Sequence, residues 1–145
     1  AGGWVVDNDQ VEALCKLHPD KFYGFASVDP HREDALEVLE RAFCRQGLRG
    51  LKLNPSKQRF DPSDERMEPI YALCERENKP IIFHAGLSWE PNAPARYAHP
   101  LAFEEVAIRH PDLRICLAHF AWPWVREMVM LMIKYPNVYT DTALL

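Results

Sequence analysis

The fold is decided by the stretch Lys79-Pro80-Ile81-Ile82-Phe83-His84-Ala85-Gly86, where an apolar, β-prone run leads into a histidine and two small residues. A short apolar run of this kind is typical of a parallel strand covered on both faces. The histidine then follows the carboxyl end of the strand, where α/β folds place their ligands. The pattern returns in Ile115-Cys116-Leu117-Ala118-His119. Two such histidines indicate a functional site.

The rest of the chain alternates between strand and helix patterns. Strand patterns begin near residues 22, 48, 80, 114 and 138, with a helical pattern between each pair. This alternation predicts right-handed crossovers and a parallel sheet. Two α/β architectures satisfy it: a partial (β/α)8 TIM barrel of about five βα units, or a complete five-stranded doubly wound sheet. A whole barrel typically needs ~250 residues, so the length of 145 residues alone favours the doubly wound sheet.

Composition places the chain among globular proteins of one domain. Hydrophobic residues make up 48% and charged residues 26%, a balance that supports a buried core. The formal net charge of −4 offers no basic field for nucleic acid. No apolar run approaches the ~20 residues of a membrane span. We therefore expect neither a nucleic-acid partner nor a membrane.

Four cysteines lie inside helix or strand patterns among apolar neighbours. They are Cys15, Cys44, Cys74 and Cys116, and none forms a C-x-x-C pair. This spacing favours buried free thiols over disulfides or a zinc knuckle. Free thiols predict a reducing, cytoplasmic compartment.

Each strand-end histidine has two interpretations. A neutral imidazole at the mouth of a parallel sheet is a common ligand for zinc and related metals, and Ala85 and Gly86 leave the space above His84 free. His84 could equally be a core histidine bonded to a neighbouring carbonyl. His119 could be a metal ligand or a general acid/base, or could pack against Trp122 or Trp124.

Four further residues are weaker candidates. Lys52 lies in an otherwise apolar strand pattern, which indicates a structural salt bridge or, less favoured, an active-site cation. Asp141 follows the last strand pattern and could orient a ligand histidine or simply form a turn. Trp122 and Arg96 lie in loops after strands, where substrate contacts are common.

Several motifs occur in an order that resembles a known family. They are Gly24-Phe25-Ala26-Ser27-Val28-Asp29-Pro30, Gly50-Leu51-Lys52-Leu53-Asn54-Pro55, the two histidine-bearing strands, and Asn137-Val138-Tyr139-Thr140-Asp141. Together they resemble the amidohydrolase-related branch of the metal-dependent hydrolases. That branch includes aminocarboxymuconate-semialdehyde decarboxylase and several aromatic-acid decarboxylases.

The resemblance implies a distorted (β/α)8 barrel with a divalent metal, expected to be zinc, at its C-terminal mouth. Members carry a His-x-His pair on the first strand, histidines on the fifth and sixth, and an aspartate on the eighth. By motif match, His84 is the fifth-strand metal ligand and His119 the sixth-strand histidine. The implied function is hydrolysis or decarboxylation of a small organic substrate by metal-activated water and a histidine acid/base.

The sequence departs from that pattern. It contains no His-x-His, and Asp141 would end the seventh strand rather than the eighth. Residues 1–145 are therefore expected to be one hydrolase-like domain that lacks the first strands and the last strand of the barrel. Its open sheet edges predict a homo-oligomer or another partner. The alternative is a catalytically incomplete α/β binding or assembly module that binds no metal alone.

Overall fold

The computed structural model describes residues 6–144 and contains one parallel four-stranded sheet. Its strands are β1 (Leu51–Leu53), β2 (Ile81–Phe83), β3 (Ile115–Leu117) and β4 (Val138–Thr140). Each strand pairs with the next strand along the chain, in the order β1-β2-β3-β4. A doubly wound sheet reverses its strand order at one point, whereas a barrel does not. The partial barrel is therefore confirmed, and the doubly wound alternative is wrong.

The strand predicted near residues 22–28 is reduced to a single bridge. Ala26 pairs in parallel with Leu51, and its backbone N–H donates to the Gly50 carbonyl at 2.8 Å. The bridge extends the sequential order by one position before β1. Among residues 6–144 only the β1 side pairs with this segment as a strand, whereas the Asn8 side chain bonds the Ser27 N–H and carbonyl at 2.9 and 3.1 Å. Pairing with a single strand leaves the segment short, and Tyr23 in it is 77% exposed.

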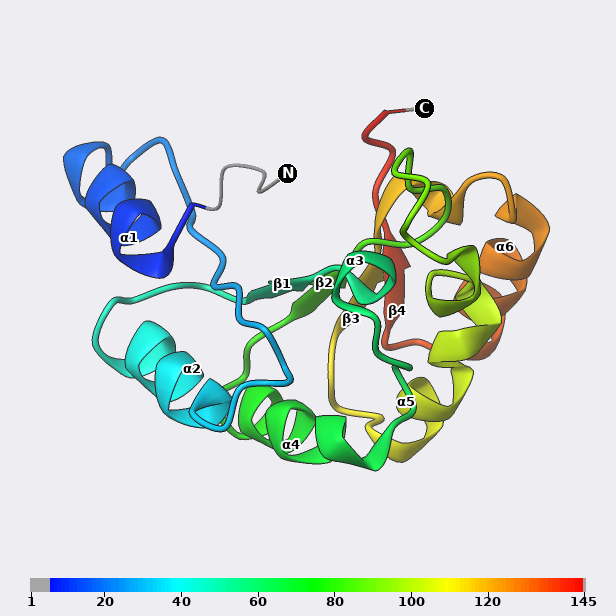
Figure 1. The fold of residues 1–145 in the computed structure, drawn as a ribbon, viewed down its shortest axis with the longest axis horizontal. Coiled ribbons are helices and arrows are strands. Elements are labelled where there is room, and N and C mark those ends of the chain that lie inside the picture. The colour runs from blue at the N-terminus through cyan, green and yellow to red at the C-terminus, as the bar shows by residue number, and fades with distance from the viewer. Residues whose placement is uncertain (1–5, 145) are drawn as a thin grey trace.

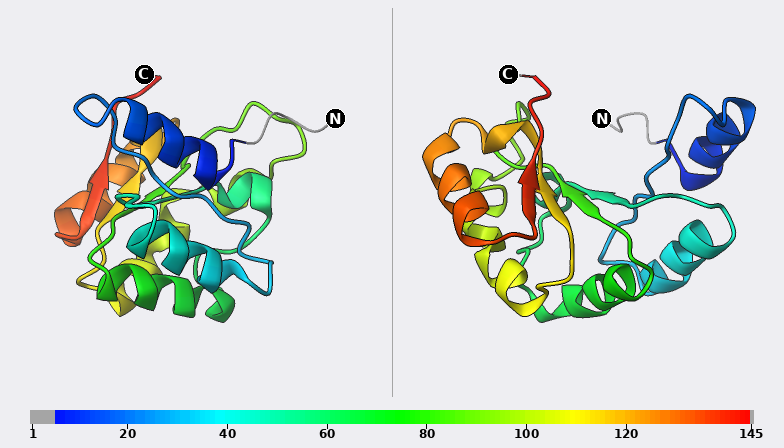
Figure 2. Two further views of the ribbon diagram at one scale, coloured as in Figure 1. Left: turned by 90° about the vertical axis from the view of Figure 1, so that its left-hand side faces the viewer. Right: turned by 180° about the vertical axis from the view of Figure 1, so that it is seen from behind.

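The helices of residues 6–144 are α1 (Asn8–Leu17), α2 (Ala35–Cys44), α3 (Pro55–Gln58), α4 (Glu68–Arg76), α5 (Glu104–Arg109) and α6 (Val125–Lys134). Short 3-10 turns span Glu65–Met67, Ala95–Tyr97, Pro100–Phe103 and Ala118–Ala121. Helices α2, α4, α5 and α6 form an arc around the sheet, and the opposite side opens toward the two termini (Figures 1 and 2). No helix within residues 6–144 has the length and apolar character to cross a membrane.

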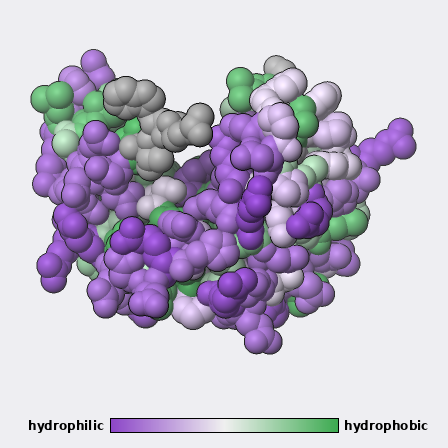
Figure 3. Space-filling model, in the orientation of Figure 1, coloured by the Kyte–Doolittle hydropathy of each residue, from purple (hydrophilic) through white to green (hydrophobic). Residues whose placement is uncertain are grey.

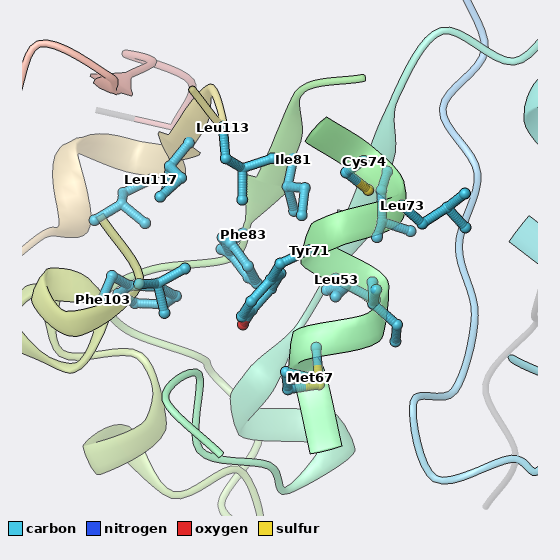
Figure 4. Close-up of a cluster of buried hydrophobic side chains, with 14 of the residues drawn as sticks. Leu53, Met67, Tyr71, Leu73, Cys74, Ile81, Phe83, Phe103, Leu113 and Leu117 are labelled. Atoms are coloured by element: carbon cyan, nitrogen blue, oxygen red, sulfur yellow. The ribbon is translucent and has the colours of Figure 1, made fainter. Parts of the chain in front are cut away.

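The core lies between the sheet and this arc of helices. The first and third residues of β1, β2 and β3 are all buried, while the middle residues are only partly buried. The buried strand residues meet Tyr71 on α4 and Phe103 before α5 (Figure 4). Burying one such side chain contributes about 1.5–3 kcal/mol. The middle residues, Lys52 among them, face the side of the sheet that no helix covers.

Polar contacts fix the turns that feed β3 and β4. The buried Asn137 side chain donates to the carbonyls of Ala107, His110 and Leu113 at 3.3, 2.9 and 3.2 Å. The His110 ring bonds Glu75 and Glu68 on α4, each at 2.9 Å. These contacts tie the end of α5 to α4 and to the start of β4.

The cysteine prediction is correct in part. All four cysteines are free thiols, but only Cys74 is buried, and burial raises its thiol pKa to about 12. Cys44 is exposed, because it lies at the last residue of α2 on the solvent side of the helix arc. The expectation of a buried thiol at Cys44 is wrong.

Candidate metal centre

The two strand-end histidines lie next to each other. His84 follows β2 and His119 follows β3, and these strands are hydrogen-bonded neighbours. Their imidazole centroids are 5.0 Å apart, with the ring planes at 63°. This spacing leaves room for an atom bonded to one nitrogen of each ring. Parallel register thus places together two residues that are far apart in the sequence.

The His84 ring has one nitrogen engaged and one free. Its Nε2 lies 3.2 Å from the Leu87 carbonyl oxygen, which can only accept, so Nε2 carries the proton. In the neutral ring Nδ1 therefore keeps its lone pair. Burial lowers the pKa of His84, and the charge of Lys52 lowers it further. Both effects keep the ring neutral, the form that binds a metal.

The His119 ring has the complementary arrangement. Its Nδ1 lies 2.9 Å from the Ala143 carbonyl oxygen, so Nδ1 carries the proton and Nε2 keeps a lone pair. The ring packs against His84 rather than against Trp122 or Trp124. Trp124 instead lies against His99, with ring centroids 4.8 Å apart. One histidine thus offers Nδ1 and the other offers Nε2.

Asp141 holds the turn that carries His119. Residues 119, 120 and 121 have φ values of 62°, 50° and 49°, a left-handed conformation that is costly for residues other than glycine. Asp141 Oδ1 accepts from the backbone N–H of His119 at 2.9 Å and of Ala143 at 3.0 Å. Its backbone carbonyl accepts from Phe120 at 2.9 Å. Asp141 therefore orients His119 through the main chain, with its carboxylate 3.8 Å from Nδ1.

Removing this carboxylate is expected to loosen the turn. Asp141→Ala leaves two backbone donors without their acceptor and should lower the free energy of unfolding by about 1–3 kcal/mol. Asp141→Asn keeps an oxygen acceptor and should cost well under half as much. Urea unfolding of both variants measures the difference. Equal losses for alanine and asparagine would show that the two hydrogen bonds do not support the turn.

The Lys52 ammonium has no ion-pair partner among residues 6–144. The favoured salt bridge is absent: among residues 6–144 no carboxylate lies within ion-pair distance of its ammonium, and Asp141 acts on it only through longer-range charge. Burial lowers the Lys52 pKa, and the charges of Asp141 and Cys116 oppose that shift. The middle position of β1 explains this isolation, because neighbouring strands present Ile82 and Cys116 at the same level.

The side chains of the two loop candidates form no hydrogen bond with either histidine within residues 6–144, although the backbone N–H of Trp122 donates to the His119 carbonyl at 3.0 Å. Trp122 is 48% exposed, and its backbone carbonyl accepts from the Leu87 N–H at 2.8 Å. Arg96 is exposed and donates to the Tyr97 hydroxyl at 2.8 Å. Within the described part of the chain no hydrogen bond joins the Arg96 side chain to either histidine. Two surface grooves, of about 600 and 480 Å³, are lined by α2 and its neighbours, away from the histidines.

The donor set fits part of a metal site. Two imidazoles, each with one nitrogen not engaged by a carbonyl, match the ligands that zinc and similar metals prefer. Residues 6–144 contain no group of three His, Cys, Asp or Glu side chains placed to hold a metal ion. A catalytic centre usually has three protein ligands. His84 and His119 can therefore supply two metal ligands, and a third ligand would have to come from outside residues 6–144.

Sequence reasoning missed the groups that orient these rings. The carbonyls of Leu87 and Ala143 select which nitrogen of each histidine is free. Every residue has a carbonyl, so no residue type could have revealed them. A local signal was present only at Gly86, whose small size permits the close approach of the two loops.

A sequential parallel sheet with facing histidines beyond two adjacent strands defines a barrel protein with a candidate metal site at its mouth. The chain matches the amidohydrolase family over residues 1–145 and belongs to that family. An uncharacterized TIM-barrel protein from Bordetella bronchiseptica is 30% identical, with a TM-score of 0.84 over 94% of this chain and 49% of that one. The chain thus spans about half the length of this barrel.

Two decarboxylases share the fold at lower identity. The 5-carboxyvanillate decarboxylase of Sphingomonas paucimobilis is 16% identical, with a TM-score of 0.67 over 93% of this chain and 52% of that enzyme. The 5-carboxyvanillate decarboxylase of Novosphingobium aromaticivorans, solved with bound manganese, is 17% identical. Its TM-score is 0.62 over 92% of this chain and 47% of that enzyme. At these identities the likeness shows the TIM-barrel fold.

Proposed function

We propose that the chain supplies His84 and His119 to the divalent metal centre of an amidohydrolase-superfamily enzyme that hydrolyses or decarboxylates a small organic substrate. One observation carries the proposal: two adjacent imidazoles, 5.0 Å apart, each have one nitrogen engaged by a backbone carbonyl. The remaining nitrogens, Nδ1 of His84 and Nε2 of His119, are free to share one ion. The manganese bound by a structurally similar decarboxylase supports a divalent metal, and zinc remains our prediction.

The two histidines suit different roles. His84 is partly buried beside Lys52, and both conditions lower its pKa. It therefore stays neutral and serves as a ligand. His119 can either bind through Nε2 or take up a proton there, because its Nδ1–H bond to Ala143 persists in the charged ring. When bound, a divalent metal supplies Lewis acidity toward water or a substrate oxygen.

Metal removal tests this function in the intact protein that contains the chain. We expect dialysis against a chelator to abolish turnover, and Zn²⁺ or Mn²⁺ to restore it. A panel of hydroxybenzoates, followed by CO₂ release, and small lactones and amides, followed by acid release, separates decarboxylation from hydrolysis. Full turnover in the chelated, metal-free protein would contradict the proposal.

A second candidate is a catalytically incomplete binding or assembly module. It is favoured by the lack of a three-residue metal cluster within residues 6–144. The two candidates differ in metal stoichiometry, because a module needs no ion. One equivalent of tightly bound metal in the intact protein, lost on replacement of His84, would exclude the module.

A further inference from the structure

Lys52 lies on the face of the sheet that no helix covers, and the proposed metal centre does not account for it. It is the middle residue of β1, where the burial pattern turns its side chain away from the helix-covered core. Its ammonium is partly buried and has no ion-pair or hydrogen-bond partner among residues 6–144. A cation held out of water without a counter-charge is unfavourable. Such a group is expected where an anion binds.

The surroundings of Lys52 indicate what kind of anion fits. At the same level on the next two strands lie Ile82 and Cys116, which present a largely apolar surface beside the cation. Lys52 lies opposite Ile82, two residues before His84, so it lies near the carboxyl end of the sheet that carries the two histidines. The molecular surface is hollowed at the open end of the arc, between α1 and the C-terminal segment (Figure 3). Lys52, Ile82 and Cys116 each keep part of their surface exposed, so this face is accessible to solvent.

We infer that Lys52 is the carboxylate-binding residue of this site, and that the substrate is a small organic carboxylate whose apolar body lies over Ile82 and Cys116. This inference rests on the proposed function, since it places the substrate beside the His84–His119 pair. Lys52 binds and orients the carboxylate by a charge-assisted hydrogen bond. It takes no part in metal binding. Arg96 is a poorer candidate, because its guanidinium is exposed and already donates to Tyr97.

Benzoate and benzamide make a matched pair of probes for the intact, metal-loaded protein. They share shape and apolar surface, but only benzoate is charged. Calorimetric titration should give a dissociation constant for benzoate at least about tenfold lower than for benzamide. Lys52→Met should remove this preference, and Lys52→Arg should keep most of it. Lys21→Met, at an exposed position, is the control and should bind benzoate like the wild type.

Metal content is measured on the same samples. A failure of the proposed metal centre can then be distinguished from a failure of the proposed carboxylate binding by Lys52. Lys52→Met should keep its metal while losing the preference for benzoate, which supports the inference. Equal binding of benzoate and benzamide by the wild type would overturn it. Unchanged benzoate affinity in Lys52→Met would also overturn it, and would leave Lys52 as a structural charge. Absence of metal from the wild-type protein would refute the proposed function instead.

Discussion

Replacing His84 with alanine is expected to weaken Zn²⁺ or Mn²⁺ binding by the intact protein at least about 100-fold. Residues that only orient metal ligands already contribute about 10–100-fold to affinity, and His84 is proposed to bind directly. The variant should still fold, because among residues 6–144 the His84 imidazole makes a single hydrogen bond, to the Leu87 carbonyl. Metal analysis after dialysis, together with circular dichroism, measures both effects.

The control for this variant is another histidine that lies outside the site. His18 follows α1, is exposed, and has its ring 5.9 Å from Phe22. His18→Ala should keep the wild-type metal content. If His84→Ala also kept its metal, His84 would be a structural histidine bonded to a carbonyl, and the proposed centre would be wrong.

Replacing Gly86 with alanine is expected to lower the free energy of unfolding by on the order of 3 kcal/mol or more, since backbone strain and overpacking each cost about 1–3 kcal/mol. Gly86 has a φ of 84°, and a Cβ there would lie 2.3 Å from the Trp122 carbonyl oxygen. The opposing atoms belong to the backbone of the His119 turn, which Leu87 also contacts at 2.8 Å. The loops cannot separate without losing that bond.

Gly47 is a matched control for this substitution. Its φ is 68°, but a Cβ at that position would meet no atom within 4 Å. Gly47→Ala should therefore show only the conformational penalty, on the order of 1–2 kcal/mol. Urea unfolding of both variants separates strain from collision. Equal destabilisation by the two substitutions would mean that the close approach of the two loops is not required.

The sequence was sufficient to predict the elements of the fold that depend on a local residue pattern. Apolar strand runs, helix periodicity and the histidine after each run are readable within a few residues. Strand order was not readable from that pattern, because it depends on which distant segments pair. The family resemblance favoured a barrel, whereas length alone favoured a doubly wound sheet. The pairing of β1 through β4 in sequence decides for the barrel.

The sequence placed the two histidines of the candidate site beyond neighbouring strands but did not reveal the contacts around them. Parallel register brings His84 and His119 together, as expected of residues that follow neighbouring strands. The absence of an ion pair at Lys52 depends on side chains from other strands, and its local sequence favoured a salt bridge. Asp141 was expected to act on a histidine ring or to form a turn. It holds the backbone of His119, since its carboxylate lies nearer that N–H than the ring.

Nitrogen-15 NMR of the histidine rings in the intact protein can show whether His84 and His119 bind one metal ion together. In the metal-free protein, two-bond proton–nitrogen correlations should show the Nε2–H form for His84 and the Nδ1–H form for His119. Addition of one equivalent of Zn²⁺ should shift the Nδ1 resonance of His84 and the Nε2 resonance of His119. Histidine resonances that do not move at either residue, or tautomers opposite to these, would contradict a metal centre built on this pair.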